Sequence, residues 1–163
     1  MEKYETVFES ENIIYVKLSP LLVDDYLKMI NNPNVANKIS HEASSYSYEE
    51  EVAWVNKKLK KETCDFSMLE KGTMDFIGNI GIDINNNVGE IGISITPEKQ
   101  NQHYGRESMK AIIKYGYDVL NLDGFELNVY YTNSNAIKCY QNVGFIEDGK
   151  GKEPDDIHMI YKK

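Results

Sequence analysis

The sequence predicts an α+β (mixed α/β) sandwich, in which helices cover both faces of a central, mostly antiparallel twisted sheet. Short runs with period-two alternation are typical of strands, and they are interspersed with longer runs whose apolar residues recur at helical spacing. The predicted order of elements is β α α β β β α β α β β. The chain of 163 residues has the length of one ordinary domain, and no internal repeat or low-complexity tract divides it. Residues 1–163 are therefore expected to form a single domain.

The first strand is predicted at residues 12–18 (NIIYVKL). A helix is expected to follow it, because Ser19 suits the N-cap position and Pro20 suits the first helical position. The apolar face of this helix contains Leu22, Tyr26, Met29 and Ile30. Residues 33–47 are rich in Asn, Ser and Ala and are predicted to form a loop.

A second helix is predicted to begin at Ser47 and to run to about Lys61. Ser47 and Glu50 form the S-x-x-E pattern of a capping box. The apolar side of the helix contains Val52, Val55 and Leu59. A hairpin is expected next, and its strands are residues 65–70 and 75–84.

The strand at residues 90–95 has two different faces. Ile91, Ile93 and Ile95 point one way, and Glu90, Gly92 and Ser94 point the other way. A core-facing helix follows, with Met109, Ile112, Ile113, Gly116 and Leu120 at helical spacing. The remaining predicted elements are a strand at residues 124–131, a short helix at 133–144, and an antiparallel pair at 145–149 and 156–162.

Composition limits the classes of function. The formal net charge of −8 argues against a nucleic-acid surface, and the lysines at positions 57, 58, 60 and 61 are interpreted as a solvated helix face. No run approaches the ~20 apolar residues that cross a bilayer, so a cytoplasmic protein without membrane contact is expected. Cys64 and Cys139 show no paired spacing and are expected to be reduced thiols. The histidines His41, His103 and His158 show no metal-site spacing, so no metal is expected.

A polar turn, PEKQNQHYGRES at residues 97–108, joins a strand to a helix. Such a turn leaves the first N–H groups of the helix unpaired, and with the helix dipole they favour an anion such as phosphate. Gly105 would allow a close approach of the ligand, and Arg106 and Gln102 can add donors. Taken alone, Gly105 is also explained by a tight turn, and neither common nucleotide-binding glycine motif is present.

Two segments together resemble the GNAT superfamily of acyl-CoA-dependent N-acyltransferases. The acyl-CoA loop of that family, [RQ]-x-x-G-x-[GA], is similar to residues 100–105, except that His103 replaces the first glycine. The later pattern N-x-x-A-x-x-x-Y-x-x-x-G-F matches Asn133, Ala136, Tyr140, Gly144 and Phe145. The resemblance spans nearly the whole chain, and its order of elements is similar to the branch of ribosomal-protein N-terminal and spermidine acetyltransferases.

The resemblance implies that acetyl-CoA lies where the strands at 90–95 and 125–131 splay apart. The residues expected to bind it are Ile93, Ser94 and Ile95, the loop residues Gln100, Asn101, Gln102, His103, Tyr104, Gly105 and Arg106, and Asn135 and Tyr140. The strand backbone would pair with pantetheine, and the loop N–H groups would hold the pyrophosphate. His103 can either crowd the pyrophosphate or donate to it.

The resemblance also implies catalytic roles. From the resemblance, Tyr140 is expected to be the general acid for the departing thiolate. The base is assigned from the residues alone: Glu90 is polar and stands at the start of the strand beside the thioester, so it is the candidate that accepts the amine proton through water. A backbone N–H of Ser94 or Ile95 would stabilise the oxyanion. The alternatives are a core aromatic for Tyr140 and a solvent-facing carboxylate for Glu90. A covalent role for Cys139 is disfavoured, because adjacent helical residues project about 100° apart.

The expected function is therefore direct acetyl transfer from acetyl-CoA to a primary amine. The acceptor is either a small molecule such as a polyamine or the amino terminus of a protein. The alternative is a non-catalytic acyl-CoA-binding or regulatory module, which the histidine at position 103 motivates. The resemblance implies an acceptor pocket lined by residues 24–50. His41 lies in this range and is interpreted as a surface-loop residue, with a place at the border of the pocket as the alternative. A homodimer is possible.

Overall fold

The sheet determines the architecture of the protein. The computed structural model describes residues 3–33 and 46–162, in which eight strands form one sheet with the order β1-β2-β3-β4-β5-β6-β8-β7. The strands are β1 (Thr6–Glu9), β2 (Ile13–Lys17), β3 (Cys64–Glu70), β4 (Phe76–Asn85), β5 (Val88–Ile95), β6 (Gly124–Tyr130), β7 (Ile146–Lys150) and β8 (Asp156–Lys162). Every neighbouring pair is antiparallel except β5 and β6. The predicted fold class is confirmed.

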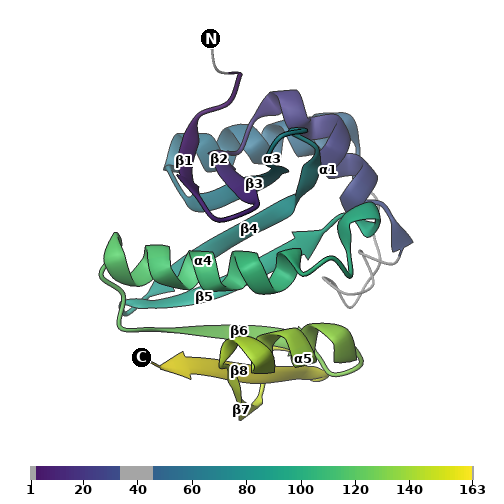
Figure 1. Ribbon diagram of the computed structural model, residues 1–163. Coiled ribbons are helices and arrows are strands. Elements are labelled where there is room, and N and C mark those ends of the chain that lie inside the picture. Colours follow the sequence, from purple (N-terminus) through teal and green to yellow (C-terminus); the bar gives the residue numbers. More distant parts are fainter. Residues whose placement is uncertain (1–2, 34–45, 163) are drawn as a thin grey trace.

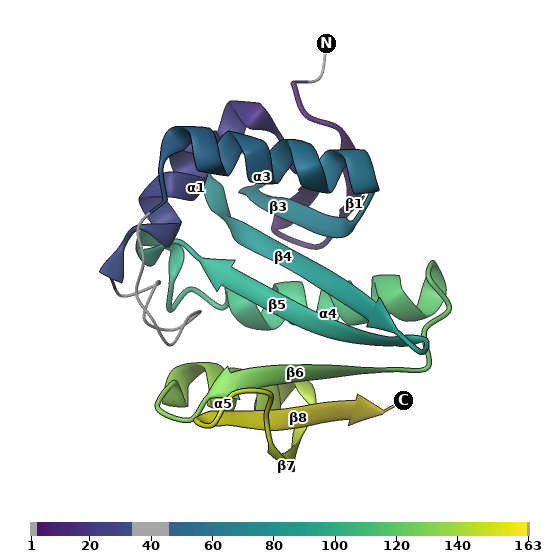
Figure 2. The same cartoon turned by 180° about the vertical axis from the view of Figure 1, so that it is seen from behind.

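Helices cover both faces of this sheet (Figures 1 and 2). The helices are α1 (Val23–Ile30), α3 (Tyr48–Lys61), α4 (Tyr104–Asp118) and α5 (Ser134–Val143), and short 3₁₀ turns lie at Pro20–Leu22 and Pro97–Lys99. Helices α1 and α3 pack on one face, and α4 and α5 pack on the other. None of the helices within residues 3–33 and 46–162 combines the length and the apolar character that a bilayer-crossing helix needs.

The prediction that the sheet begins at residues 12–18 is wrong, because β1 precedes that strand and pairs with it. Strand β1 has only four residues (TVFE), its two end residues are exposed, and its register with β2 is interrupted by a bulge. A short edge strand of this kind lacks the alternation that identifies strands in a sequence. The other predicted helices and strands are present, with ends displaced by a few residues at most.

The predicted helix starts are confirmed by their hydrogen bonds. The Glu50 N–H donates to Ser47 Oγ at 3.1 Å, and the Ser47 N–H donates to Glu50 Oε1 at 3.1 Å, so the capping box of α3 is complete. Ser19 Oγ accepts from the Leu21 N–H at 3.1 Å and caps the 3₁₀ turn that leads into α1. Most of the predicted loop at 33–47, including His41, lies outside the described residues.

Two hydrophobic clusters lie on opposite sides of the sheet. The larger one joins α4 to the strands through residues such as Met109, Ile112 and Phe125. The smaller one joins α1 and α3 to the other face through Tyr26 and Val55. Because successive residues of a strand point to opposite faces, β5 contributes its isoleucines to the larger cluster and presents Glu90, Gly92 and Ser94 towards α1 and α3.

Strands β5 and β6 pair over only a short distance. Their parallel register runs from Val88 opposite Gly124 to Glu90 opposite Glu126 and then ends. Beyond this point the two strands diverge, as Figure 2 shows. Backbone groups on the facing edges of the diverging segments therefore lack a ladder partner in the neighbouring strand. The predicted splay between the strands at 90–95 and 125–131 is confirmed.

Gly78 allows the close approach of β4 to β5 beside this splay. A Cβ at this position would lie 2.0 Å from the Ser94 carbonyl oxygen and 2.9 Å from Ile95 Cα. Because both neighbours are backbone atoms, Gly78→Ala should lower the free energy of unfolding by about 2–3 kcal/mol. Denaturant unfolding monitored by circular dichroism measures this loss.

A matched control is available one strand away. A Cβ at Gly92 has no heavy atom within 4 Å, so Gly92→Ala should change the free energy of unfolding by under ~0.5 kcal/mol. Equal losses for the two variants would contradict the steric explanation, because only one of the two positions is crowded.

Candidate active site

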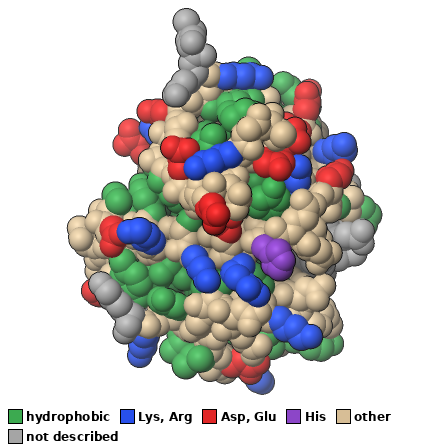
Figure 3. All heavy atoms as spheres, in the orientation of Figure 1, with side chains coloured by type: hydrophobic (Ala, Val, Ile, Leu, Met, Phe, Trp, Pro, Cys, Tyr) green, Lys and Arg blue, Asp and Glu red, His purple; other side chains and the backbone are tan. Residues whose placement is uncertain are grey.

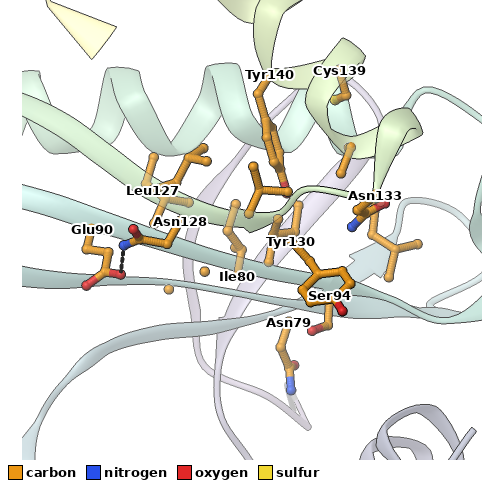
Figure 4. Close-up of a pocket in the computed structure, with 18 of the residues that line it drawn as sticks. Asn79, Ile80, Glu90, Ser94, Leu127, Asn128, Tyr130, Asn133, Cys139 and Tyr140 are labelled. Carbon is orange, nitrogen blue, oxygen red and sulfur yellow. Dashed lines mark hydrogen bonds between the residues drawn. The ribbon is translucent and has the colours of Figure 1, made fainter. Parts of the chain in front are cut away.

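A cleft of about 1330 Å³ passes through the opening between β5 and β6. One side of it is lined by α1, α3 and the polar face of the sheet, and the other side by residues 100–106 and α5. Figure 4 shows side chains of β4, β5, β6 and α5 around this opening, among them Asn79, Ser94, Tyr130 and Tyr140. The cleft therefore connects the two faces of the sheet where its ladder is interrupted.

Most of the predicted site residues line this cleft. These are Glu90, Ile93, Ser94, Ile95, Gln100, Asn101, His103, Gly105, Arg106, Asn135 and Tyr140. The two others, Gln102 and Tyr104, are not part of the lining. The Gln102 amide donates to the Glu98 carbonyl at 2.8 Å, and the Tyr104 side chain is buried and interacts with Glu70.

The turn before α4 has an unusual backbone. Asn101 has φ +62° and His103, the N-cap residue of α4, has φ +68°, so both adopt the left-handed conformation. Glycine adopts this conformation without steric cost, whereas other residues meet their own carbonyl groups there. Position 103 therefore has a backbone conformation that favours glycine, and in this chain a histidine occupies it.

The start of α4 offers free donors to the cleft. The His103 side chain makes no capping hydrogen bond, and a helix has no internal acceptors for its first N–H groups, here those of Tyr104, Gly105 and Arg106. The helix dipole adds a partial positive charge at the same place. A Cβ on Gly105 would lie 3.5 Å from Cys139 Sγ and 3.6 Å from Ile95 Cδ1. These are ordinary van der Waals distances, so a methyl group at this position would clash with no atom of the protein.

Hydrogen bonds and ion pairs hold this turn against the sheet. The Gln100 amide donates to the Ile95 carbonyl at 2.9 Å. Lys99 Nζ lies 2.6 Å from a carboxylate oxygen of Glu70 and 3.4 Å from one of Asp75, at the β3–β4 hairpin. These contacts therefore hold the N–H groups at the start of α4 in place without a bound ligand.

Replacing His103 by glycine tests the strain at this position. The left-handed conformation costs a non-glycine residue roughly 1–2 kcal/mol, and glycine loses about 0.5–1 kcal/mol more chain entropy on folding. His103→Gly should therefore raise the free energy of unfolding by at most ~1.5 kcal/mol. Because the His103 side chain is exposed, we also expect the CoA affinity to stay within about threefold, as titration calorimetry would measure. A loss above tenfold would instead identify the imidazole as a phosphate ligand.

Tyr140 extends from α5 into the opening between the strands (Figure 4). Burial raises the pKa of its hydroxyl above the ordinary value, and neighbouring Cys139 acts in the same direction. The hydroxyl has no hydrogen-bond partner within the part of the chain that the structure describes. Tyr140 is therefore protonated at neutral pH, and its proton is available to a group bound in the cleft.

The neighbouring thiol has a different character. Burial raises the pKa of Cys139, although the charge of Arg106 opposes the shift. A protonated thiol is a poor nucleophile. The raised pKa of Cys139 thus gives no support to a covalent intermediate, and the expectation that Cys139 forms none stays a prediction.

Glu90 lies where the pairing of β5 with β6 ends. Its carboxylate accepts from Asn128 Nδ2 at 2.8 Å and from Lys152 Nζ at 2.5 Å. Burial acts to raise the pKa of Glu90, but the hydrogen bonds from Lys152 and Asn128 and the charge of Lys152 outweigh it. The pKa of this carboxyl is therefore below its ordinary value, and the group is ionised but already paired. Its role as a base stays a prediction.

The sequence did not reveal a polar network on the α1 side of the opening. The Tyr26 hydroxyl lies 2.5 Å from Ser67 Oγ, which donates to Asn79 Oδ1 at 2.8 Å. Asn79 is the cross-strand neighbour of Ser94. Nearby, Glu51 lines the cleft with only 6 % of its surface exposed. The available signal was its spacing, because Glu51 precedes Val55 by one helical turn and shares its buried face.

The charges around the cleft differ between its two sides. The side of α3 and the polar sheet face contains the carboxylates Glu50, Glu51, Asp65, Asp83, Glu90, Glu153 and Asp156. Its lysines are paired, since Lys58 lies 3.4 Å from Asp65 and Lys152 binds Glu90. On the opposite face Arg106, Lys110 and Lys138 are exposed on α4 and α5, and Figure 3 shows basic side chains across this face. One side thus favours cations and the other favours anions.

No group of three or more His, Cys, Asp or Glu side chains is arranged to hold a metal ion within residues 3–33 and 46–162.

Comparison with known proteins identifies the family. Residues 13–146 match the family described as "Acetyltransferase (GNAT) domain". Spermidine N(1)-acetyltransferase of Vibrio cholerae is 28% identical over 93 residues, which are 57% of this chain and 54% of that protein. The chain spans about half the length of the curated relatives it matches.

Solved structures share the fold. A GNAT-family acetyltransferase of Bacillus anthracis has a TM-score of 0.84 and 18% identity, covering 94% of this chain and 96% of that one. The Vibrio cholerae spermidine N-acetyltransferase, solved in complex with CoA and spermine, has a TM-score of 0.81 and 22% identity, covering 93% and 95%. The splayed strands and the helices on both faces therefore belong to an architecture that known acetyltransferases also have.

Proposed function

The chain belongs to the acetyltransferase (GNAT) domain family, and we propose that it transfers an acetyl group from acetyl-CoA directly to a primary amine. One observation carries this proposal. The cleft at the splayed strands brings together an uncapped helix N-terminus, an unpaired strand edge and the protonated hydroxyl of Tyr140. A binding module has no need of a proton donor aimed at the opening, so the geometry favours catalysis over binding alone.

The residues on the α4 and α5 side fit CoA. The N–H groups at the start of α4 and the guanidinium of Arg106 are suited to a pyrophosphate. The free edge of β5 at residues 93–95 suits an extended amide chain such as pantetheine, which would add to it as a strand does. Asn135 lines the same side of the cleft and can contribute its amide.

Acetyl-CoA, when bound, supplies an activated acyl group as a thioester. The protein contributes proton transfer on either side of the sheet. We assign Tyr140 as the donor that protonates the departing thiolate, because it is the tyrosine of α5 that lines the cleft and it keeps its proton at neutral pH. We assign Glu90 as the base that accepts the amine proton through water, because it is ionised and lies on the other side.

The acceptor side favours cationic amines. Carboxylates outnumber lysines along this wall, and the lysines are paired. A free alkylamine has a pKa of ~10.4 and is positively charged at pH 7, so such a wall concentrates it. Small amines, including polyamines, are therefore the acceptor class that we propose. The name of the Vibrio cholerae relative, a spermidine N(1)-acetyltransferase, agrees with this choice.

An amine panel tests the proposed function. Purified protein is incubated with acetyl-CoA and one amine at a time, and the released CoA thiol is measured. The panel contains monoamines, diamines, polyamines and short peptides with free amino termini, and reactions without an amine give the background rate. Thiol release above background with a cationic amine is expected. Binding of acetyl-CoA without release for any amine would refute the enzyme and favour a binding module.

A further inference from the structure

Glu51 is a buried carboxylate that faces the cleft without a partner. It is 6 % exposed and belongs to the cleft lining. Within the described part of the chain its carboxylate forms no hydrogen bond and no ion pair. The acceptor wall is the side of the cleft formed by α3 and the polar face of the sheet, with the carboxylates Glu50, Glu51, Asp65, Asp83, Glu90, Glu153 and Asp156. Every other carboxylate of this wall is more exposed than Glu51.

A buried carboxylate of this kind is costly for the folded protein. Burial raises the pKa of Glu51, and no neighbouring cation lowers it again. Its helical neighbour on the same face, Val55, is fully buried in the cluster between α3 and the sheet. An apolar residue at position 51 would complete that face, and the exposed Glu49 and Glu50 already supply the first turn of α3 with acidic residues that favour the helix dipole, so packing and the dipole do not call for a buried glutamate here.

The surroundings of Glu51 place it on the acceptor side of the opening. It acts electrostatically on Tyr26, whose hydroxyl contacts Ser67, and Ser67 in turn donates to Asn79. Asn79 lies beside Ser94 across the β4–β5 ladder, and Ser94 belongs to the diverging segment of β5. Tyr140 approaches the same opening from the opposite face of the sheet.

The other candidate carboxylate is less available. Glu90 is held by Asn128 and Lys152 at the apex of the splay. It precedes Ser94 by four strand residues, which correspond to roughly 13 Å along the strand. A cation that reached Glu90 would have to compete with Lys152, whereas Glu51 has no such competitor among the described residues.

We propose that Glu51 binds the positively charged amino group of the acceptor and so selects cationic amines over neutral ones. The inference rests on the proposed function for the identity of the ligand. The bound ammonium supplies the charge partner and the hydrogen-bond donors that Glu51 lacks in the free protein. Glu51 is thereby an acceptor-binding residue of α3, and Glu90 and Tyr140 keep their roles in proton transfer.

The substitution Glu51→Gln removes the charge with little change of shape. We expect the KM for a cationic amine to rise at least about tenfold, because a desolvated charge pair loses one partner. The KM for acetyl-CoA should stay within about twofold, and kcat should change less than the amine KM does. The melting temperature should not fall, since an unpaired buried charge has been removed. Glu51→Asp retains the charge and should recover part of the amine affinity.

Glu49→Gln is the matched control. Glu49 lies in the same first turn of α3, is exposed, and does not line the cleft. The substitution Glu49→Gln therefore removes one negative charge and its interaction with the helix dipole, as Glu51→Gln does, but leaves the acceptor wall unchanged. An unchanged amine KM is expected for this variant.

Amine-induced thermal stabilisation gives a second measurement that does not need turnover. With CoA present, spermidine should stabilise the wild type and Glu49→Gln, and should stabilise Glu51→Gln much less. Equal amine KM or equal stabilisation for Glu51→Gln and wild type would overturn the role of Glu51 even if the enzyme is active. A lower melting temperature with an unchanged amine KM would identify a structural residue instead. Absence of turnover with a clear Glu51-dependent stabilisation would refute the proposed function and support the cation site.

Discussion

Tyr140→Phe is expected to lower kcat by about 10²–10⁴-fold, the usual contribution of a general acid. Its acetyl-CoA affinity should stay nearly unchanged, because the ring stays in place and only the hydroxyl is lost. That hydroxyl has no partner among the described residues, so its removal leaves no buried group unsatisfied. Steady-state kinetics and calorimetric titration of CoA separate the two effects.

The pH dependence sharpens this expectation. Burial raises the pKa of Tyr140 above the ordinary value for tyrosine, ~10. The hydroxyl therefore keeps its proton as pH rises through 7, 8 and 9, and it should cause no falling limb of kcat below about pH 10. Tyr115→Phe is a suitable control, because Tyr115 stacks on Phe8 with ring centroids 4.5 Å apart, outside the cleft. If Tyr140→Phe weakened CoA binding while retaining kcat, the tyrosine would be a binding residue rather than the acid.

Much of the fold could be predicted from the sequence, because helix caps and strand faces depend on residues that are close together in the chain. The Ser47 and Glu50 pair predicts the start of α3 because both capping hydrogen bonds form within one helical turn. The alternation of isoleucine with small or polar residues in β5 predicts which residues face α4. Strand β1 was not predicted, because its four residues show no alternation of apolar and polar side chains and form a strand by pairing with β2.

The part of the candidate site that backbone N–H groups form could be predicted from the sequence. The part that depends on which hydrogen-bond partner a side chain has was harder to predict. The spacing of glycine and arginine after a strand indicated the donors at the start of α4. The Gln102 amide, in contrast, binds the Glu98 carbonyl instead of facing the cleft, and no sequence pattern distinguishes these two choices. Glu51 is a similar case, since only packing of α3 against the sheet shows that an acidic residue of its first turn is buried.

Gly105→Asp should weaken CoA binding by at least about 100-fold while the protein stays folded. The new carboxylate would lie at the N–H groups that we assign to the pyrophosphate, and the like charges would repel in a partly desolvated site. The fold should tolerate the residue, because the added Cβ meets Cys139 and Ile95 at ordinary contact distances of 3.5 and 3.6 Å. An acidic side chain in the first helical turn also interacts favourably with the helix dipole.

Gly105→Ala separates the steric effect from the charge effect. Alanine is favoured over glycine inside a helix by about 1 kcal/mol, so this variant should be slightly more stable than the wild type. If the N–H groups at the start of α4 require a close approach of phosphate to the backbone, CoA affinity should nevertheless fall. The loss should be smaller than for Gly105→Asp. Calorimetric titration and thermal unfolding of both variants measure the two quantities independently. Unchanged CoA affinity in Gly105→Asp would move the phosphate site away from α4, because a fixed anion at those donors cannot coexist with a bound one.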